Sequence, residues 1–200
     1  MSGIDYSEIW LDYADKSYIA TRLLWFTGFV IEAPVNAHRT IELFLKSYLV
    51  GQGIRVERGS SAWGHEIGKL CQEAEKIDSS FGHQDLQKRV KFFERYFDYV
   101  RYPSEQISPD DGSLTWFSFD SNILPLDEVV AFIRPRVKLK DNAWASTTLN
   151  RLLSDRSKAQ PHQLRAIEDG NNFLDLINTV TTYQSTVKFN SSFNFDKPGC

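Results

Sequence analysis

Apolar residues recur at helical intervals through the first 138 positions of this 200-residue chain. In five stretches they return every three or four positions, the spacing that places side chains on one face of an α-helix. The pattern predicts helices over 7–28, 34–50, 67–74, 84–99 and 125–133. The fourth is the clearest, because its apolar positions step by four, three, four and three. These positions are Leu86, Val90, Phe93, Phe97 and Val100.

Glycine and proline mark the ends of these expected helices. Gly28 and Gly51 are natural stops for the first two, because glycine closes a helix at little steric cost. Pro103 should end the fourth, since the residue before a proline is restricted to extended geometry. We expect the fifth helix to start at Pro125, and Pro135 should end or kink it.

Two regions depart from the helical pattern. Between 104 and 122, turn residues precede an aromatic stretch, which predicts a loop insertion with a short extended segment at 114–119. After residue 138 the periodicity is weaker, and we expect one helix over 143–153 and another after Pro161 that a Gly-Asn-Asn turn interrupts. The final residues alternate as a strand does, which indicates a tail that docks.

These elements predict an all-α fold, an up-and-down bundle of four to five helices with a loop insertion. The bundle occupies residues 1–138. Residues 139–200 are expected to form a C-terminal extension, partly helical and docked on the bundle. A chain with 42% hydrophobic residues can fill a core of this size.

Charge, cysteine content and hydropathy narrow the function classes. The net charge is only -3, so any site for an anion must be a local patch. Cys71 and Cys200 make neither a disulfide framework nor a metal set, and no metal or other cofactor is expected. No apolar run approaches the ~18 residues of a membrane span, and the first residues lack a basic leader region. We therefore expect a cytoplasmic protein with no membrane partner.

Four short stretches together resemble the HEPN domain family. The segment 10–20 pairs aromatic residues with alanines, and 37–46 carries alanine, glutamate, leucine and lysine at the family's spacing. The segment 64–70 begins with glycine, histidine and glutamate. The sequence Arg101-Tyr102-Pro103 is similar to the arginine, tyrosine and proline that end the family's later helix. The resemblance covers about two-thirds of the chain.

The resemblance implies a helical bundle that forms a homodimer with a binding cleft between the subunits. Members of the family bind nucleotides or RNA, and some pair with a nucleotidyltransferase antitoxin. Many others resemble metal-independent ribonucleases that carry an arginine and a histidine with four to six residues between them. Such an enzyme needs a base for the 2′-hydroxyl proton and a cation for the phosphate, and histidine and arginine supply these roles.

The arginine-histidine spacing occurs twice in this chain. Six residues separate Arg58 from His65, and five separate Arg156 from His162. Chance alone gives roughly 0.7 such pairs in a chain of this composition, so the matches carry little weight. Arg101, in the corresponding place of the resemblance, is followed by no histidine. The weak catalytic candidates are therefore His65, Arg101, Arg156 and His162.

A second set of cationic and polar residues is a candidate for ligand binding. Lys88, Lys91 and Arg95 repeat on one face of the fourth helix, where they could hold phosphate or simply face solvent. Glu42 and Lys46 form an intrahelical pair that by itself requires no function. The predicted ligand-binding residues are Lys46, His65, Lys91, Arg95, Arg101 and Tyr102.

Three functions remain as hypotheses. The preferred one is binding of nucleotide or RNA at a polar cleft between two subunits, in a toxin-antitoxin or defence context. The second is a metal-independent ribonuclease of the toxin type. The third is a module that binds another protein without catalysis.

Overall fold

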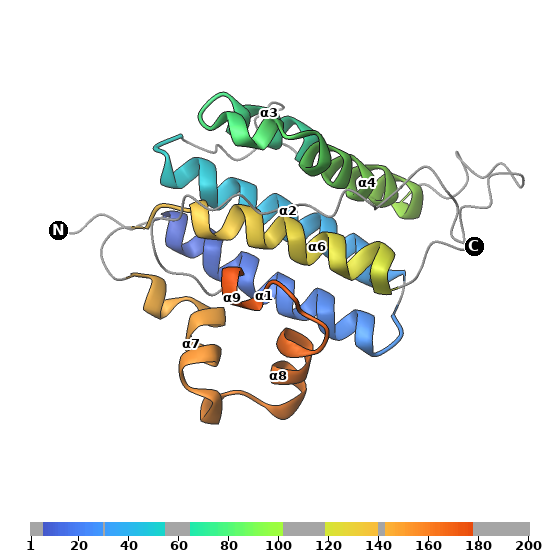
Figure 1. Cartoon of the computed structure of the whole chain (residues 1–200), viewed down its shortest axis with the longest axis vertical. Coiled ribbons are helices and arrows are strands. Elements are labelled where there is room, and N and C mark those ends of the chain that lie inside the picture. Colours follow the sequence, from blue (N-terminus) through green and yellow to red (C-terminus); the bar gives the residue numbers. More distant parts are fainter. Residues whose placement is uncertain (1–5, 30, 55–64, 102–118, 140–142, 178–200) are drawn as a thin grey trace, which may run out of the picture.

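The computed structural model describes residues 6–29, 31–54, 65–101, 119–139 and 143–177. Within these ranges the regular elements are helices, which confirms the expected all-α fold. The long helices are α1 (Tyr6–Phe26), α2 (Glu32–Gly51), α4 (Gln84–Arg101) and α6 (Phe119–Ile133), and α3 (Ile67–Glu75) is shorter. The four long helices run in alternating directions along the chain, as an up-and-down bundle requires (Figure 1).

Short helices follow the bundle. They are α7 (Thr148–Ser154), α8 (Pro161–Glu168) and α9 (Leu174–Ile177). Single 3-10 turns lie at Ser79–Gly82, Arg134–Arg136, Ala143–Ser146 and Arg156–Lys158. None of the described helices is long and apolar enough to cross a lipid bilayer. The expected tail at 187–200 lies outside the described residues.

The first four expected helices lie where the sequence pattern placed them, whereas the expected start of the fifth is wrong. Helix α6 begins at Phe119, so Pro125 lies inside it. The extra turn is retained because Ile123 is buried against Trp25 and Ala33 in a second, smaller apolar cluster. Phe119 is helical, so the extended segment expected at 114–119 is wrong at that residue. The rest of the segment, 114–118, lies outside the described residues. As expected, α6 ends before Pro135, and a 3-10 turn follows.

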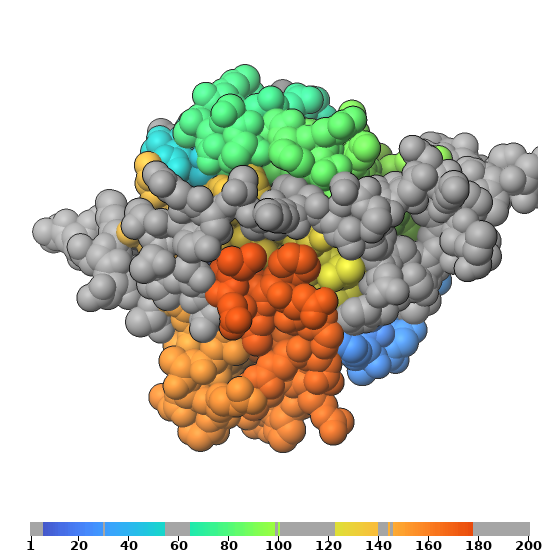
Figure 2. Space-filling view, viewed as in Figure 1, coloured from blue at the N-terminus to red at the C-terminus, as the bar shows by residue number. Residues whose placement is uncertain are grey.

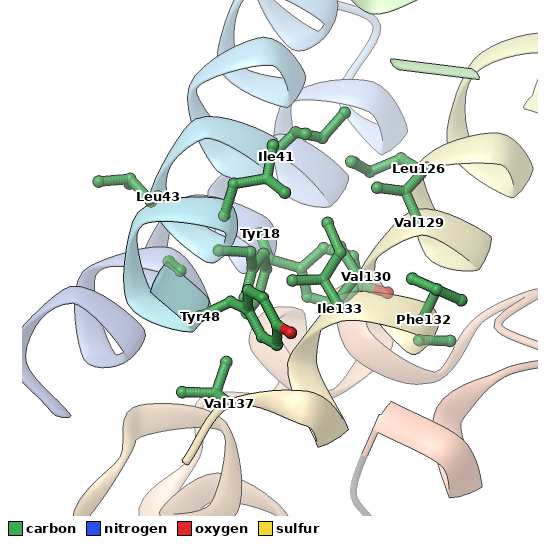
Figure 3. Packing of buried hydrophobic residues seen from close by; sticks show 14 of the residues in the cluster. Tyr18, Ile41, Leu43, Tyr48, Leu126, Val129, Val130, Phe132, Ile133 and Val137 are labelled. Atoms are coloured by element: carbon green, nitrogen blue, oxygen red, sulfur yellow. The ribbon is translucent and has the colours of Figure 1, made fainter. Parts of the chain in front are cut away.

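The apolar core lies where α1, α2 and α6 meet. Tyr18, Ile41, Tyr48, Val130 and Ile133 are among the residues that fill it (Figure 3). Helices α3 and α4 pack on α2 and add further buried residues from their apolar stripes. Each such side chain contributes about 1.5–3 kcal/mol when it leaves water. The core therefore fixes the relative positions of the helices that carry the site described below.

Three ion pairs between distant parts of the chain are buried inside the bundle. They join Arg22 to Asp127, Arg89 to Glu128 and Arg134 to Asp15. The Arg134 guanidinium contacts both oxygens of Asp15, at 2.8 and 3.0 Å. Charged groups are stable in such places only when paired and hydrogen-bonded, so these contacts fix how α1, α4 and α6 pack.

The C-terminal helices lie against α1 and α6, on the side of the bundle away from α3 and α4 (Figures 1 and 2). Polar contacts attach them. Asp12 accepts hydrogen bonds from the backbone and hydroxyl of Thr148 at 2.8 and 2.7 Å, and Asp15 accepts one from the Leu149 backbone at 3.0 Å. Arg22 donates to the carbonyl of Ala166. Carboxylates of α1 thus satisfy backbone donors at the start of α7, which otherwise lack partners.

Candidate functional site

A row of three polar side chains lies along one face of α2. His38, Glu42 and Lys46 are four residues apart, so a single face of the helix carries all three. Their exposed fractions are only 1%, 7% and 9%. Groups that can carry charge are rarely buried to this extent without partners. The contacts of this row define the site.

Glu42 lies at the centre of the row. Its Oε1 accepts a hydrogen bond from Nζ of Lys46, and its Oε2 lies 3.0 Å from Nδ1 of His65. Burial alone would raise the pKa of Glu42, but the bonds to Lys46 and His65 outweigh burial and hold this pKa below its ordinary value. Glu42 is therefore ionised at neutral pH and can only accept hydrogen bonds, which places a proton on Nδ1 of His65.

His65 is the solvent-facing member of the cluster. It lies two residues before α3, and its side chain is 70% exposed although Glu42 holds one ring nitrogen. The buried ring of His38 is also hydrogen-bonded to the His65 backbone. Both the main chain and the side chain of His65 are thus attached to α2, so its imidazole is oriented while most of its surface remains open.

His38 supports the site from the interior. Its ring stacks on Phe97 of α4, with 4.0 Å between the ring centroids and 14° between the planes. Burial lowers the pKa of His38 to about 4, and the opposing effect of the Glu42 charge is smaller. His38 is therefore neutral at physiological pH and joins α2, α4 and the start of α3.

Lys46 connects the cluster to α1. Its ammonium group lies 5.5 Å from the ring centroid of Trp10, in addition to its bond to Glu42. A cation over the face of an indole is attracted by the ring quadrupole. Contacts therefore run without a break from His65 through Glu42 and Lys46 to Trp10. We call these four residues with His38 the α2 cluster.

The α2 cluster has the chemistry of a hydrogen-bonding and proton-transfer site. A carboxylate that holds one nitrogen of an exposed imidazole orients the ring and leaves the other nitrogen to exchange a proton with a ligand. Among the residues that the structure describes, no three His, Cys, Asp or Glu side chains form a group that could hold a metal ion.

Comparison with protein families identifies the domain that carries this cluster. The HEPN domain model matches residues 7–113, which is more than half of the chain and includes every residue of the α2 cluster. The chain belongs to the HEPN family. This confirms the expected family and associates the chain in general with RNA-related or nuclease-like function. No curated protein and no solved structure matches the chain.

Several predicted ligand-binding residues lie on α4 of the HEPN domain or just beyond it. Lys91 and Arg95 are exposed there, on a helix that packs against α2 and α3. Arg101 is the last residue of α4, and its side chain lies outside what the structure describes. Tyr102 and Arg58 fall in stretches that are not described. Their roles stay predictions.

The second arginine-histidine pair lies beyond the residues that match the HEPN model. Arg156 forms an ion pair with Glu168, with 2.7 Å between Nη1 and Oε1. His162 is exposed near the start of α8. Arg156 thus has an anionic partner from the chain itself, and the roles of Arg156 and His162 stay predictions.

Sequence reasoning found His65 and Lys46 but missed the three residues that organise them. The Glu42–Lys46 spacing had indicated an ordinary helical pair, and nothing local showed that Glu42 also reaches His65, 23 positions away. His38 and Trp10 were likewise missed. The available signal was the four-residue spacing of His38, Glu42 and Lys46 on a helix that also carries an apolar face.

Proposed function

We propose that this HEPN protein binds RNA or a nucleotide at the α2 cluster, with His65 as the residue that contacts the ligand. The observation that carries this proposal is the bond between the nearly buried carboxylate of Glu42 and the exposed imidazole of His65. An exposed side chain held in one orientation loses little entropy when it binds. Family membership supports an RNA-related ligand.

The two protonation states of His65 suit different parts of a nucleotide. With Nδ1 donating to Glu42, a neutral ring leaves Nε2 to accept a hydrogen bond from a ribose hydroxyl. A protonated ring donates through Nε2 and can bind a phosphate oxygen. Lys91, Arg95, Arg101 and Tyr102 are the further residues that we propose for ligand contacts.

Titration of purified protein with a fluorescein-labelled 12-nucleotide RNA, followed by fluorescence anisotropy, tests this proposal. Isothermal titration calorimetry with ATP and GTP gives the parallel test for free nucleotides. We expect His65→Ala to weaken binding about tenfold, the loss of one charge-assisted hydrogen bond. His162→Ala is the matched control and should bind as the wild type does. Absence of affinity for RNA and for both nucleotides would rule the proposal out.

The hydrogen bond between Glu42 and His65 also favours a metal-independent ribonuclease as the second candidate function. His65 would take the 2′-hydroxyl proton, the 2′-oxygen would attack phosphorus, and the 5′-oxygen would leave and be protonated by solvent. The products are a 2′,3′-cyclic phosphate and a 5′-hydroxyl end. RNA incubated with the protein in EDTA should then be cut by the wild type and by His162→Ala but not by His65→Ala. Intact RNA at high protein concentration would exclude this activity.

We also propose that two copies of the chain pair and share the ligand, with a nucleotidyltransferase antitoxin as a further partner in a toxin-antitoxin setting. The support is the family alone, since HEPN domains are expected to form dimers with a cleft between subunits. Sedimentation or light scattering gives the mass in solution. A strict monomer at ligand-binding concentrations would contradict the shared cleft.

A further inference from the structure

One face of α1 exposes large apolar and aromatic side chains to solvent. Tyr6, Ile9 and Tyr13 are 61%, 42% and 56% exposed, and Trp10 lies between them. The intervals of three and four residues place them together on the helix surface. We call Tyr6, Ile9, Trp10 and Tyr13 the α1 aromatic face. Burying such rings against α2 or α6 would stabilise the fold, so their exposure requires another explanation.

The α1 aromatic face is continuous with the α2 cluster. Trp10 belongs to both, because the Lys46 ammonium lies 5.5 Å from its ring centroid. Lys46 in turn binds Glu42, which holds the exposed His65. Side-chain contacts therefore connect the exposed His65 to the aromatic rings of α1.

Lysine ammonium groups lie beside two of the rings on this face. Lys16 lies 5.6 Å from the ring centroid of Tyr13, and its side chain is 52% exposed. Its other partner is the Asp12 carboxylate, at 2.6 Å. With Lys46 over Trp10, two aromatic rings each have a lysine ammonium beside them. Rings with adjacent lysines can contact the bases and the phosphates of one strand at the same time.

We propose that the α1 aromatic face is a stacking platform for unpaired bases of single-stranded RNA, with the exposed Lys16 near the phosphates and His65 at the next nucleotide. This inference rests on the proposed function and narrows its ligand. The seven residue steps from Tyr6 to Tyr13 rise about 10 Å, enough for two or three bases at about 3.4 Å each. Bases in a duplex already stack on each other and cannot reach such a platform.

A second copy of the chain is the competing occupant of this face. Protein-protein interfaces enrich tyrosine and tryptophan as this face does, but their centres are depleted of lysine. Here lysines lie directly over two of the rings. Burying the exposed ammonium group of Lys16 against another protein surface would cost desolvation, whereas a phosphate beside it would be attracted. The charges therefore favour RNA over a second copy.

Anisotropy titrations with a labelled 12-nucleotide single strand, and with the same strand annealed to its complement, test the platform. The informative variant is the double change Tyr6→Ala and Tyr13→Ala. Loss of one stacked base weakens binding by about tenfold or more, so the double variant should bind the single strand at least tenfold more weakly than the wild type. Tyr6→Phe with Tyr13→Phe keeps the rings and should bind as the wild type does.

Phe29→Ala and Ile77→Ala are the matched controls. Both residues are large, apolar and exposed, at 54% and 41%, and neither belongs to the α1 aromatic face. Each variant should keep wild-type affinity for the single strand, and the wild type should bind the duplex more weakly than the single strand.

Three outcomes would overturn the platform. One is wild-type affinity in the alanine double variant while His65→Ala loses binding, which would leave the proposed function standing. Another is equal binding of single strand and duplex. The third is a wild-type dimer that becomes a monomer in the alanine double variant, which would assign the face to a second copy. A wild type that binds no RNA at all would remove both the platform and the RNA-binding proposal.

Discussion

Glu42 is a nearly buried carboxylate whose two oxygens are both used. Removing a carboxylate from water is costly unless hydrogen bonds and an opposite charge offset the loss of hydration. Lys46 supplies the charge and His65 the second hydrogen bond. A change at Glu42 should therefore affect stability and site geometry together, since it would leave the Lys46 ammonium nearly buried without its anion.

Glu42→Gln should lower the free energy of unfolding by about 1–3 kcal/mol, the cost of a buried group that loses its charged partner. Glu66→Gln is the matched control, because Glu66 and Lys69 form an ion pair with both side chains 55% exposed. That exposed pair should contribute almost nothing. Urea unfolding at pH 7 measures both variants. Equal losses of unfolding free energy in the two variants would contradict this expectation, because the nearly buried Glu42–Lys46 pair would then contribute no more than the exposed Glu66–Lys69 pair.

His38 should make the protein less stable as the pH falls below 6.5. In the unfolded chain His38 has its ordinary pKa of 6.5, whereas burial lowers the folded pKa to about 4. Between these values the unfolded state binds more protons, so stability rises with pH and decreases on acidification. The loss contributed by His38 is on the order of 2–3 kcal/mol by pH 4.

Urea unfolding of the wild type and of His38→Gln at pH 7, 6, 5 and 4.5 measures this dependence. Glutamine does not titrate, so the variant should lose less stability than the wild type over this interval. Glu42 acts in the same direction only at lower pH, because its folded pKa lies below 4.5. Identical pH profiles for the two proteins would contradict the assignment of a neutral, buried His38.

At the scale of single residues, the sequence predicted which charged side chains are exposed better than it predicted which are buried. Lys88 and Lys91 are exposed, as the helical pattern indicated. Arg22, Arg89 and Arg134 are buried, and no local pattern shows this. Their acidic partners are 105, 39 and 119 positions away, so the pairing exists only in the folded chain.

At the scale of elements, apolar residues at helical spacing predicted where the helices lie, and glycine and proline predicted where most of them end. The exception is α6, where Pro125 was expected to start the helix and instead lies within it. Proline suits a first turn, but it can also stand further inside when packing compensates for the lost hydrogen bond. The compensation here is the contact of Ile123 with Trp25 and Ala33, which joins α6 to α1 and α2.

The end of α2 provides a test of this packing. A Cβ atom at Gly51 would lie 2.6 Å from the carbonyl oxygen and 3.1 Å from the nitrogen of Lys138. Replacing a glycine within a helix by alanine ordinarily stabilises it by about 0.5–1 kcal/mol. Gly51→Ala should instead destabilise the protein by about 1–3 kcal/mol, because backbone atoms must move apart. A thermal midpoint above that of the wild type would contradict this close approach of α2 to the chain after α6.

At the scale of the whole molecule, residues 143–177 contribute partners to buried groups of the bundle. Arg134 donates to the carbonyl of Ile177 and to Asn150, and Arg22 donates to the carbonyls of Ala166 and Asp169. The HEPN match ends at residue 113, before α6 and all of these contacts. These contacts could not be predicted from the sequence, since they pair arginines with main-chain atoms more than 40 positions distant or with a single asparagine.

A chain that ends at residue 138 should therefore be much less stable than the full chain. Arg22 and Arg134 would keep their carboxylates but lose carbonyl partners, and Asp12 and Asp15 would lose the donors of α7. We expect a thermal midpoint at least 10 °C lower, or no cooperative transition, because several buried hydrogen bonds are lost together. A chain that ends at residue 177 keeps all of these contacts and is the control. Equal midpoints for the 138-residue chain and the full chain would contradict a structural role for the C-terminal helices.

We propose that RNA binds across α1 and the α2 cluster, and amide NMR spectra of the ¹⁵N-labelled 200-residue chain during titration with the 12-nucleotide single strand test this. The largest shift changes should occur at Tyr6, Tyr13, Lys46 and His65, with α7 and α8 unchanged. Shift changes confined to α7 and α8, or none at saturating RNA, would contradict it.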